Sequence, residues 1–213
     1  MTGAGRAPGV VSLDELAATI EARRGASTRY LVGIAGPPAS GKSTVASELA
    51  HRLGPHVAIV AQDGFHLADE VLERRGLRDR KGAPETFDGW GFVAALERVG
   101  GRRSHEVWLP RFDRTIEDSI AQAVAVAPDD DVVLVEGNYL LADVPPWRSI
   151  GDLLDLRVYV ELDDAVRVER LVRRHVEHGR SPAAAVAFAH ESDERNARLV
   201  AARRDRADLV LRR

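Results

Sequence analysis

The chain has 213 residues, of which 45% are hydrophobic, and carries a formal net charge of −3 at pH 7. This composition predicts one α/β domain, with or without a small lid, and argues against a broad nucleic-acid-binding surface. The absence of cysteine excludes disulfides, thiolate metal sites and a cysteine nucleophile. No apolar run approaches the length of about 20 residues that spans a membrane, and no signal-peptide pattern begins the chain. We therefore expect a cytoplasmic protein without a membrane partner.

Hydrophobic patterning predicts strands that alternate with helices along the chain. Residues 1–11 are expected to be loose, and the capping-box spacing of Ser12 and Glu15 predicts a short helix up to about residue 24. The expected strands lie at 30–35, 57–61, 132–135, 156–162 and 207–211, with an extended piece at 107–110. The expected helices lie at 43–53, 67–75, 90–98, 164–178 and 182–203, and a further helical turn is expected to begin at 145–147. Such alternation predicts a parallel sheet with helices on both faces. We divide the chain into an N-terminal segment, 1–29, and one domain over 30–213.

The segment after the first predicted core strand has the Gly-x-x-x-x-Gly-Lys-Ser pattern of a phosphate-binding loop. It reads Gly36-Pro37-Pro38-Ala39-Ser40-Gly41-Lys42-Ser43-Thr44. The glycines allow the backbone N–H groups to turn toward a triphosphate, and the helix that follows presents its positive end to the same anion. Lys42 supplies a mobile charge for the β and γ phosphates, and the Ser43 hydroxyl can ligate Mg²⁺. The pattern therefore predicts ATP and Mg²⁺ as cofactors.

Two acidic residues follow the next core strands. Asp63 comes after the strand at 57–61, and Glu136 after the strand at 132–135. Ligands of parallel α/β sheets bind beyond the carboxyl ends of the strands, although an isolated acid there can also be a cap or turn residue. Mg²⁺ needs oxygen ligands, and phosphoryl transfer needs a carboxylate that orients the acceptor hydroxyl. We expect both acids in the site.

Lysine is rare in this chain, since only Lys42 and Lys81 occur among 30 basic residues. A lysine retained among arginines suggests a site where a compact charge is preferred to a planar guanidinium. Lys81 is therefore a candidate contact for the substrate or its phosphate. The alternative is an ordinary surface lysine.

Several further stretches carry a family resemblance. They are Asp63-Gly64-Phe65-His66, Arg75-Gly76-Leu77, the run from Arg80 to Asp88, Pro110-Arg111-Phe112-Asp113-Arg114, the run from Val135 to Leu141, and Arg206-Ala207-Asp208. With the phosphate-binding loop, they resemble the superfamily of uridine kinases, phosphoribulokinases and type I pantothenate kinases. The likeness is closest to the pantothenate-kinase-like bacterial nucleoside and nucleotide kinases, and it spans roughly residues 30–211. It implies the P-loop NTPase sandwich, with a parallel sheet of about five strands, helices on both faces and a small helical lid at about 164–182.

The resemblance also implies roles for individual residues. Asp63 matches the acid that orients or deprotonates the acceptor hydroxyl, and Glu136 the acid that organises Mg²⁺ through water. The acceptor pocket is expected to include Asp63, Phe65, His66, Lys81, Phe87, Arg111, Asp113, Asn138 and Tyr139. The lid arginines are Arg170, Arg173 and Arg174. We take Arg174 as the catalytic one, and Arg170 and Arg173 remain alternatives for this role. A solvated basic face is the alternative for this helix, and an ordinary hydrogen-bonded histidine is the alternative for His66.

These features predict an ATP-dependent kinase that phosphorylates a hydroxyl of a small molecule. Three kinds of acceptor remain as alternatives: pantothenate, a sugar, and a nucleoside such as uridine. A homodimer is possible, and no nucleic-acid partner is expected. A regulatory nucleotide switch would need an Asn-Lys-x-Asp motif, but neither lysine follows an asparagine. The intact loop and acids count against a P-loop module that has lost catalysis, and no Gly-x-Gly-x-x-Gly motif supports an oxidoreductase.

Overall fold

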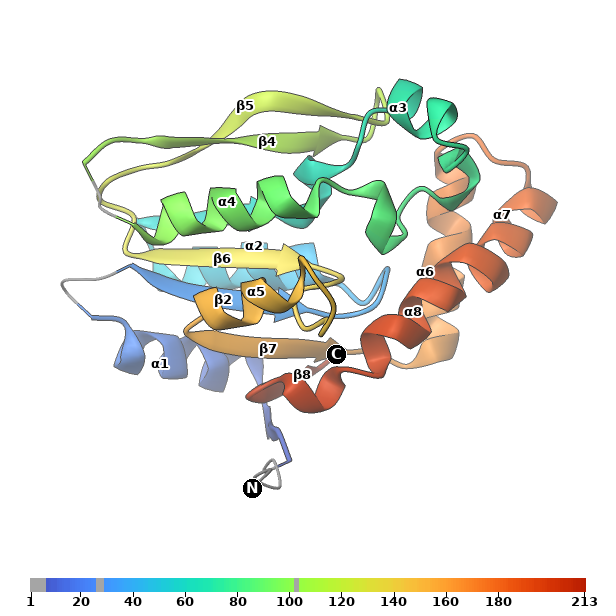
Figure 1. The fold of residues 1–213 in the computed structure, drawn as a ribbon. Coiled ribbons are helices and arrows are strands. Elements are labelled where there is room, and N and C mark those ends of the chain that lie inside the picture. Colours follow the sequence, from blue (N-terminus) through green and yellow to red (C-terminus); the bar gives the residue numbers. More distant parts are fainter. Residues whose placement is uncertain (1–6, 26–28, 102–103) are drawn as a thin grey trace.

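A central sheet of six parallel strands organises the computed structural model, which describes residues 7–25, 29–101 and 104–213 (Figure 1). In spatial order the strands are β1 (Gly9–Val11), β8 (Leu209–Arg212), β7 (Leu156–Glu161), β2 (Tyr30–Ala35), β6 (Val132–Gly137) and β3 (Val57–Ala61). The predicted α/β class is confirmed. The sheet has one strand more than the five expected, because residues 9–11 pair with β8 instead of remaining loose. Residues 7 and 8 have no regular secondary structure, and residues 1–6 of the predicted loose start lie outside the described residues.

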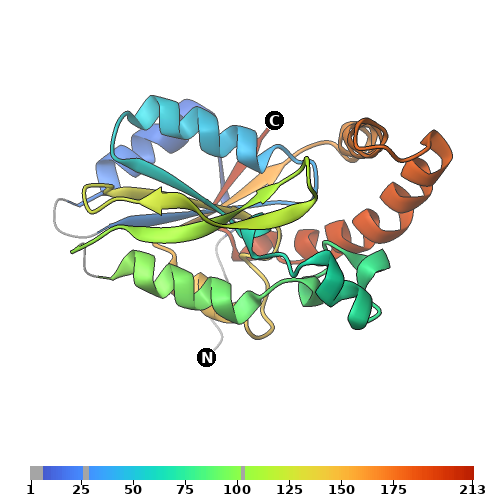
Figure 2. The same ribbon diagram turned by 90° about the horizontal axis from the view of Figure 1, so that it is seen from above.

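Helices cover both faces of this sheet (Figure 2). On one face α1 (Leu13–Arg23) and α2 (Lys42–Leu53) pack on the sheet, and on the other α4 (Gly89–Gly100) and α5 (Arg148–Leu153) do so. The strands β2 and β6 are buried almost throughout, which is typical of parallel strands that are covered on both sides. No helix in the described part of the chain is both long and apolar enough to cross a membrane.

An antiparallel hairpin forms a second, two-stranded sheet beyond the β3 edge (Figure 1). It consists of β4 (Val107–Asp113) and β5 (Asp118–Val126). The strand β4 extends the predicted piece at 107–110, whereas β5 is not among the predicted strands. Between β3 and this hairpin the chain makes an excursion that contains α3 (Asp69–Arg74).

A helical arm projects past the carboxyl ends of the strands (Figures 1 and 2). It contains α6 (Asp164–Glu177), α7 (Pro182–Phe188), a π-helical turn (Ala189–Asp193) and α8 (Glu194–Ala201). Arg167 is buried and pairs with Asp164 and Glu194, so it ties α6 to α8. This arm contains the segment at about 164–182 that the sequence predicted as a lid.

Candidate active site

The phosphate-binding loop connects β2 to α2. Gly41, the residue before α2, has φ of +94°, a conformation that a residue with a side chain rarely adopts. The first-turn N–H groups of α2 therefore face the space beyond the sheet, where a helix N-terminus favours an anion. This local geometry fits the triphosphate of ATP.

Three polar side chains meet at the start of α2. Lys42 is buried, and its Nζ donates a hydrogen bond to the Pro37 carbonyl at 3.0 Å. The Ser43 hydroxyl donates to Glu136 Oε1 at 2.8 Å. Burial lowers the pKa of Lys42 to about 8, against the opposing charges of Glu136 and Asp63. Burial also raises the pKa of Glu136, and the nearby Asp63 carboxylate raises it further.

The oxygens of the Ser43 hydroxyl and the Glu136 carboxylate are suitable ligands for a hard divalent cation. The described residues contain no group of three or more His, Asp or Glu side chains that could hold a metal by themselves. Mg²⁺ commonly uses one or two protein oxygens and completes its shell with phosphate and water. Ser43 and Glu136 would hold Mg²⁺ in this way.

Asp63 lies just after β3, on a short 3₁₀ turn, Gln62–Phe65. Its Oδ2 accepts a hydrogen bond from Arg114 Nη2 at 3.2 Å, and the carboxylate is about one-third exposed. A Cβ atom at Gly64 would lie 2.4 Å from the carbonyl oxygen of Pro110, so only glycine lets this turn approach β4 so closely. The glycine of the Asp-Gly-Phe motif therefore places Asp63 against the hairpin that carries Arg114.

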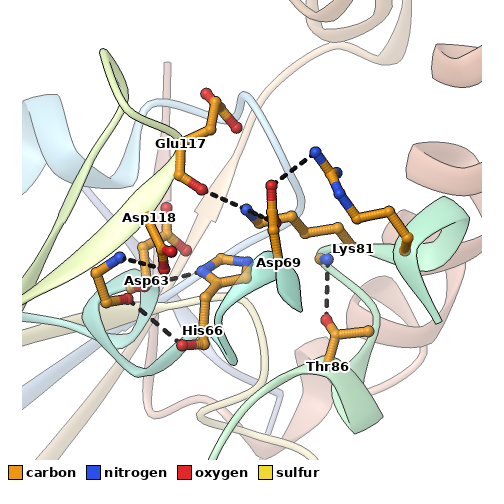
Figure 3. Close-up of polar contacts among 10 residues, drawn as sticks. Asp63, His66, Asp69, Lys81, Thr86, Glu117 and Asp118 are labelled. Carbon is orange, nitrogen blue, oxygen red and sulfur yellow. Dashed lines mark hydrogen bonds and ion pairs between the residues drawn. The ribbon is translucent and has the colours of Figure 1, made fainter. Parts of the chain in front are cut away.

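Beside Asp63, His66 lies between two aromatic rings. Its ring centroid is 4.0 Å from that of Phe87 and 4.9 Å from that of Phe112. Its Nδ1 lies 2.8 Å from the Asp63 carbonyl oxygen (Figure 3). Burial lowers the pKa of His66 and therefore favours the neutral form of the ring. Since a carbonyl only accepts hydrogen bonds, Nδ1 carries the proton and Nε2 is left as an acceptor.

Lys81 joins three segments that are distant in the sequence. Its Nζ donates to Asp69 Oδ1 at 2.5 Å and to the backbone carbonyl of Glu117 (Figure 3). It also lies 5.1 Å from the centroid of the Phe112 ring, and its side chain is only 11% exposed. The second oxygen of Asp69 accepts from Arg78 at 2.6 Å. Lys81 thus connects α3 to the turn of the hairpin, and this geometry favours a supporting role over the substrate contact expected from the sequence.

One cavity of about 610 Å³ brings most of the predicted residues together. The predicted residues that line it are Pro38, Ala39, Gly41, Lys42, Ser43, Thr44, Asp63, His66, Lys81, Phe87, Glu136, Asn138, Arg170, Arg173 and Arg174. The loop residues Gly36, Pro37 and Ser40 lie behind this surface. The phosphate-binding loop, both acids and the lid arginines therefore face one space.

Four predicted acceptor-site residues do not line this cavity. Arg111 and Asp113 flank Phe112 on β4, and because side chains alternate along a strand, Phe112 faces the cavity while its neighbours do not. Phe65 is buried against the core, with its ring 4.8 Å from that of Phe92. Tyr139 is also buried, and its hydroxyl donates to the Gly82 carbonyl at 2.6 Å. Their expected contact with the acceptor is not supported by this arrangement.

The cavity also contains residues that the sequence did not indicate. Phe112 and Arg114 belong to a motif that carries the family resemblance, but their roles were not assigned. Asn196 on α8 is only 3% exposed and lines the cavity. An asparagine within a helix gives no local signal of this placement.

The three lid arginines take different positions. The Nη1 atom of Arg170 lies 3.8 Å from the position that a Cβ at Gly41 would take, so it is next to the phosphate-binding loop. Arg173 is exposed and lies 4.0 Å from Glu177. Arg174 is more deeply placed, and both burial and the charge of Arg114 lower its pKa from the usual arginine value. The charge of Arg174 also lowers the pKa of Lys42, and the Asp63 carboxylate raises the pKa of Arg174, so the charges of these three side chains influence one another.

Comparisons with known proteins agree with this geometry. The family model described as "AAA domain" matches residues 32–194. A candidate uridine kinase of Schizosaccharomyces pombe is 34% identical over 182 residues, which cover 81% of this chain and 77% of that protein. The pantothenate kinase of Corynebacterium diphtheriae is 33% identical over 77% of this chain, but the match covers only 55% of that enzyme. The crystal structure of a candidate fructose transport system kinase from Silicibacter sp. TM1040 is 40% identical, with a TM-score of 0.86 over 94% of this chain and 98% of that one. The chain therefore belongs to the AAA-domain family, and it is a P-loop kinase of the superfamily that includes uridine kinase and pantothenate kinase.

Proposed function

We propose that this kinase transfers the γ-phosphate of Mg-ATP to a hydroxyl group of a small polar molecule. One observation carries the proposal. The phosphate-binding loop, the Ser43–Glu136 pair and the Asp63 carboxylate face the same cavity, which continues to the aromatic rings around His66. A nucleotide phosphate and an acceptor hydroxyl could therefore meet beside Asp63.

At the nucleotide end, Lys42 and the N–H groups at the start of α2 bind the β and γ phosphates. Ser43 and Glu136 would hold Mg²⁺ directly or through water, and a bound Mg²⁺ would supply positive charge that offsets the negative charge of these phosphates. Arg170 adds a positive charge next to the loop. Arg174 approaches the transferred phosphoryl group from the lid, where a cation stabilises the charge that is spread over its oxygens.

At the acceptor end, Asp63 orients the hydroxyl and accepts its proton. The hydroxyl oxygen then forms a bond to the γ phosphorus, while the bond from that phosphorus to the β–γ bridging oxygen breaks and leaves ADP. Arg114 holds the Asp63 carboxylate in place. The rings of His66, Phe87 and Phe112 form an aromatic wall beside the acceptor, and the side-chain amide of Asn196 can donate to the acceptor and accept from it.

A panel of acceptors tests this function. Uridine, pantothenate and fructose represent the three classes named for the relatives, and each is added to the purified chain with Mg-ATP. ADP release and the mass of the product are measured. We expect one class to give a phosphorylated product, and Lys42→Ala to abolish that product. The matched control is Arg74→Ala, an exposed basic residue outside the cavity, which should retain activity.

Two results would contradict the proposal. One is binding of ATP without acceptor-dependent turnover across the panel, as a nucleotide switch would show. The other is near wild-type turnover by Lys42→Ala with an acceptor that the wild-type chain phosphorylates.

A further inference from the structure

A second cavity, of about 480 Å³, lies between the loop that follows β6 and helix α8. Its walls are mainly apolar, and they are formed by Pro84, Tyr139, Leu141, Ala142, Val144, Trp147, Leu199, Val200 and Ala202. Its size and apolar character are those of small-molecule sites in proteins. None of the steps in phosphoryl transfer uses this space.

The remaining lining residues give this cavity a positive edge. Three arginines on or next to α8 are balanced by only two carboxylates, Asp143 and Glu191. Arg203 pairs with Asp143 at 2.9 Å. Arg198 has only a 3.8 Å contact with Glu194 and is 79% exposed, and Arg195 has no ion pair among the described residues. Two guanidinium groups are thus available to an anion.

The spacing of these residues places charge and apolar surface together. Arg195, Arg198 and Leu199 are three and four residues apart, so they lie on one face of α8. Asn196 lines the catalytic cavity instead. Helix α8 therefore presents different residues to the two cavities, although Asn138 lines both.

We propose that this second cavity binds a small amphipathic monoanion, a carboxylate with an aliphatic or aromatic body. The apolar body packs against Trp147, Val144 and Leu199. The carboxylate lies at the mouth, where Arg195 and Arg198 donate charge-assisted hydrogen bonds. A neutral molecule with the same body would gain the apolar contact alone.

Calorimetric titration of octanoate into the full chain tests this proposal. The chain is first saturated with a non-hydrolysable ATP analogue and Mg²⁺, which occupy the nucleotide end of the catalytic cavity. We expect octanoate to bind at one saturable site, and 1-octanol to bind at least about fivefold more weakly. Leu199→Glu should lower the affinity for octanoate by about tenfold or more. Arg195→Ala should weaken octanoate but leave 1-octanol unchanged.

Val186→Glu is the matched control, because Val186 is an exposed residue of α7 that lines neither cavity. It is 44% exposed and Leu199 is 52% exposed, so neither glutamate is buried on folding, and circular dichroism checks both variants. Three results would overturn the proposal: no saturable binding of octanoate, equal binding of 1-octanol, or equal losses in Leu199→Glu and Val186→Glu. Because the experiment measures binding of octanoate, its result does not depend on whether the proposed kinase chemistry is correct.

Discussion

Lys81→Met should destabilise the acceptor side of the protein. The change removes two charge-assisted hydrogen bonds, to Asp69 and to the Glu117 carbonyl. Each such bond contributes about 1.5–3 kcal/mol. Asp69 keeps Arg78 as a partner, and methionine retains most of the apolar stem that lies near Phe112, so the total loss is smaller than the sum. We expect the free energy of unfolding to fall by about 2 kcal/mol.

Urea unfolding of the wild-type chain, Lys81→Met and Arg74→Met measures this loss. Arg74 is the control, because it is 69% exposed and lies 3.8 Å from Glu70, and exposed pairs of this kind contribute about 0.5 kcal/mol or less. Equal changes in Lys81→Met and Arg74→Met would refute the supporting role. A raised acceptor KM without any loss of stability would instead show that Lys81 is a direct substrate contact, as the lysine count suggested.

Three further predictions concern the nucleotide end and the lid. Burial lowers the pKa of Lys42 to about 8, so the lysine loses its proton above this pH. ATP affinity should therefore be nearly constant below pH 8 and should fall by up to about tenfold per pH unit above it. An ATP affinity that does not change between about pH 7 and pH 9 would show that the charge of Lys42 does not contribute to ATP binding. Glu136→Gln should raise the Mg²⁺ concentration needed for half-maximal turnover by about tenfold or more, because Ser43 loses its carboxylate partner, and an unchanged Mg²⁺ dependence would count against a metal role. Arg167→Met should lower the free energy of unfolding by about 2–3 kcal/mol, because Glu194 loses its buried partner; an unchanged urea midpoint would show that this pair does not stabilise the lid.

Local patterns predicted the buried strands and the helices because their hydrophobic residues repeat within each segment. Two strands lack such a signal. The strand β1 has only three residues and depends on its pairing with β8, which lies about 200 residues later in the chain. The strand β5 is mostly half-buried or exposed, so its pattern is weak without β4 beside it.

The candidate site was likewise predictable from the sequence only in part. Asp63 and Glu136 could be found because each ends a recognisable strand, and the ends of parallel strands meet at one edge. The ion pair between Arg114 and Asp63 joins residues 51 positions apart, and no local pattern specifies it. The motif around Phe112 was identified, but which of its side chains faces the cavity depends on the register of β4.

The most direct test of the proposed chemistry is Asp63→Asn, measured with the acceptor that the panel identifies. Asparagine keeps the shape of the side chain and can still accept from Arg114, but it cannot take the proton of the hydroxyl. We expect kcat to fall by about 10²-fold or more, with ATP affinity within about a factor of two of the wild-type value. Wild-type turnover in Asp63→Asn, or a loss that arises entirely from weaker ATP binding, would contradict the assignment of Asp63 as the residue that activates the acceptor.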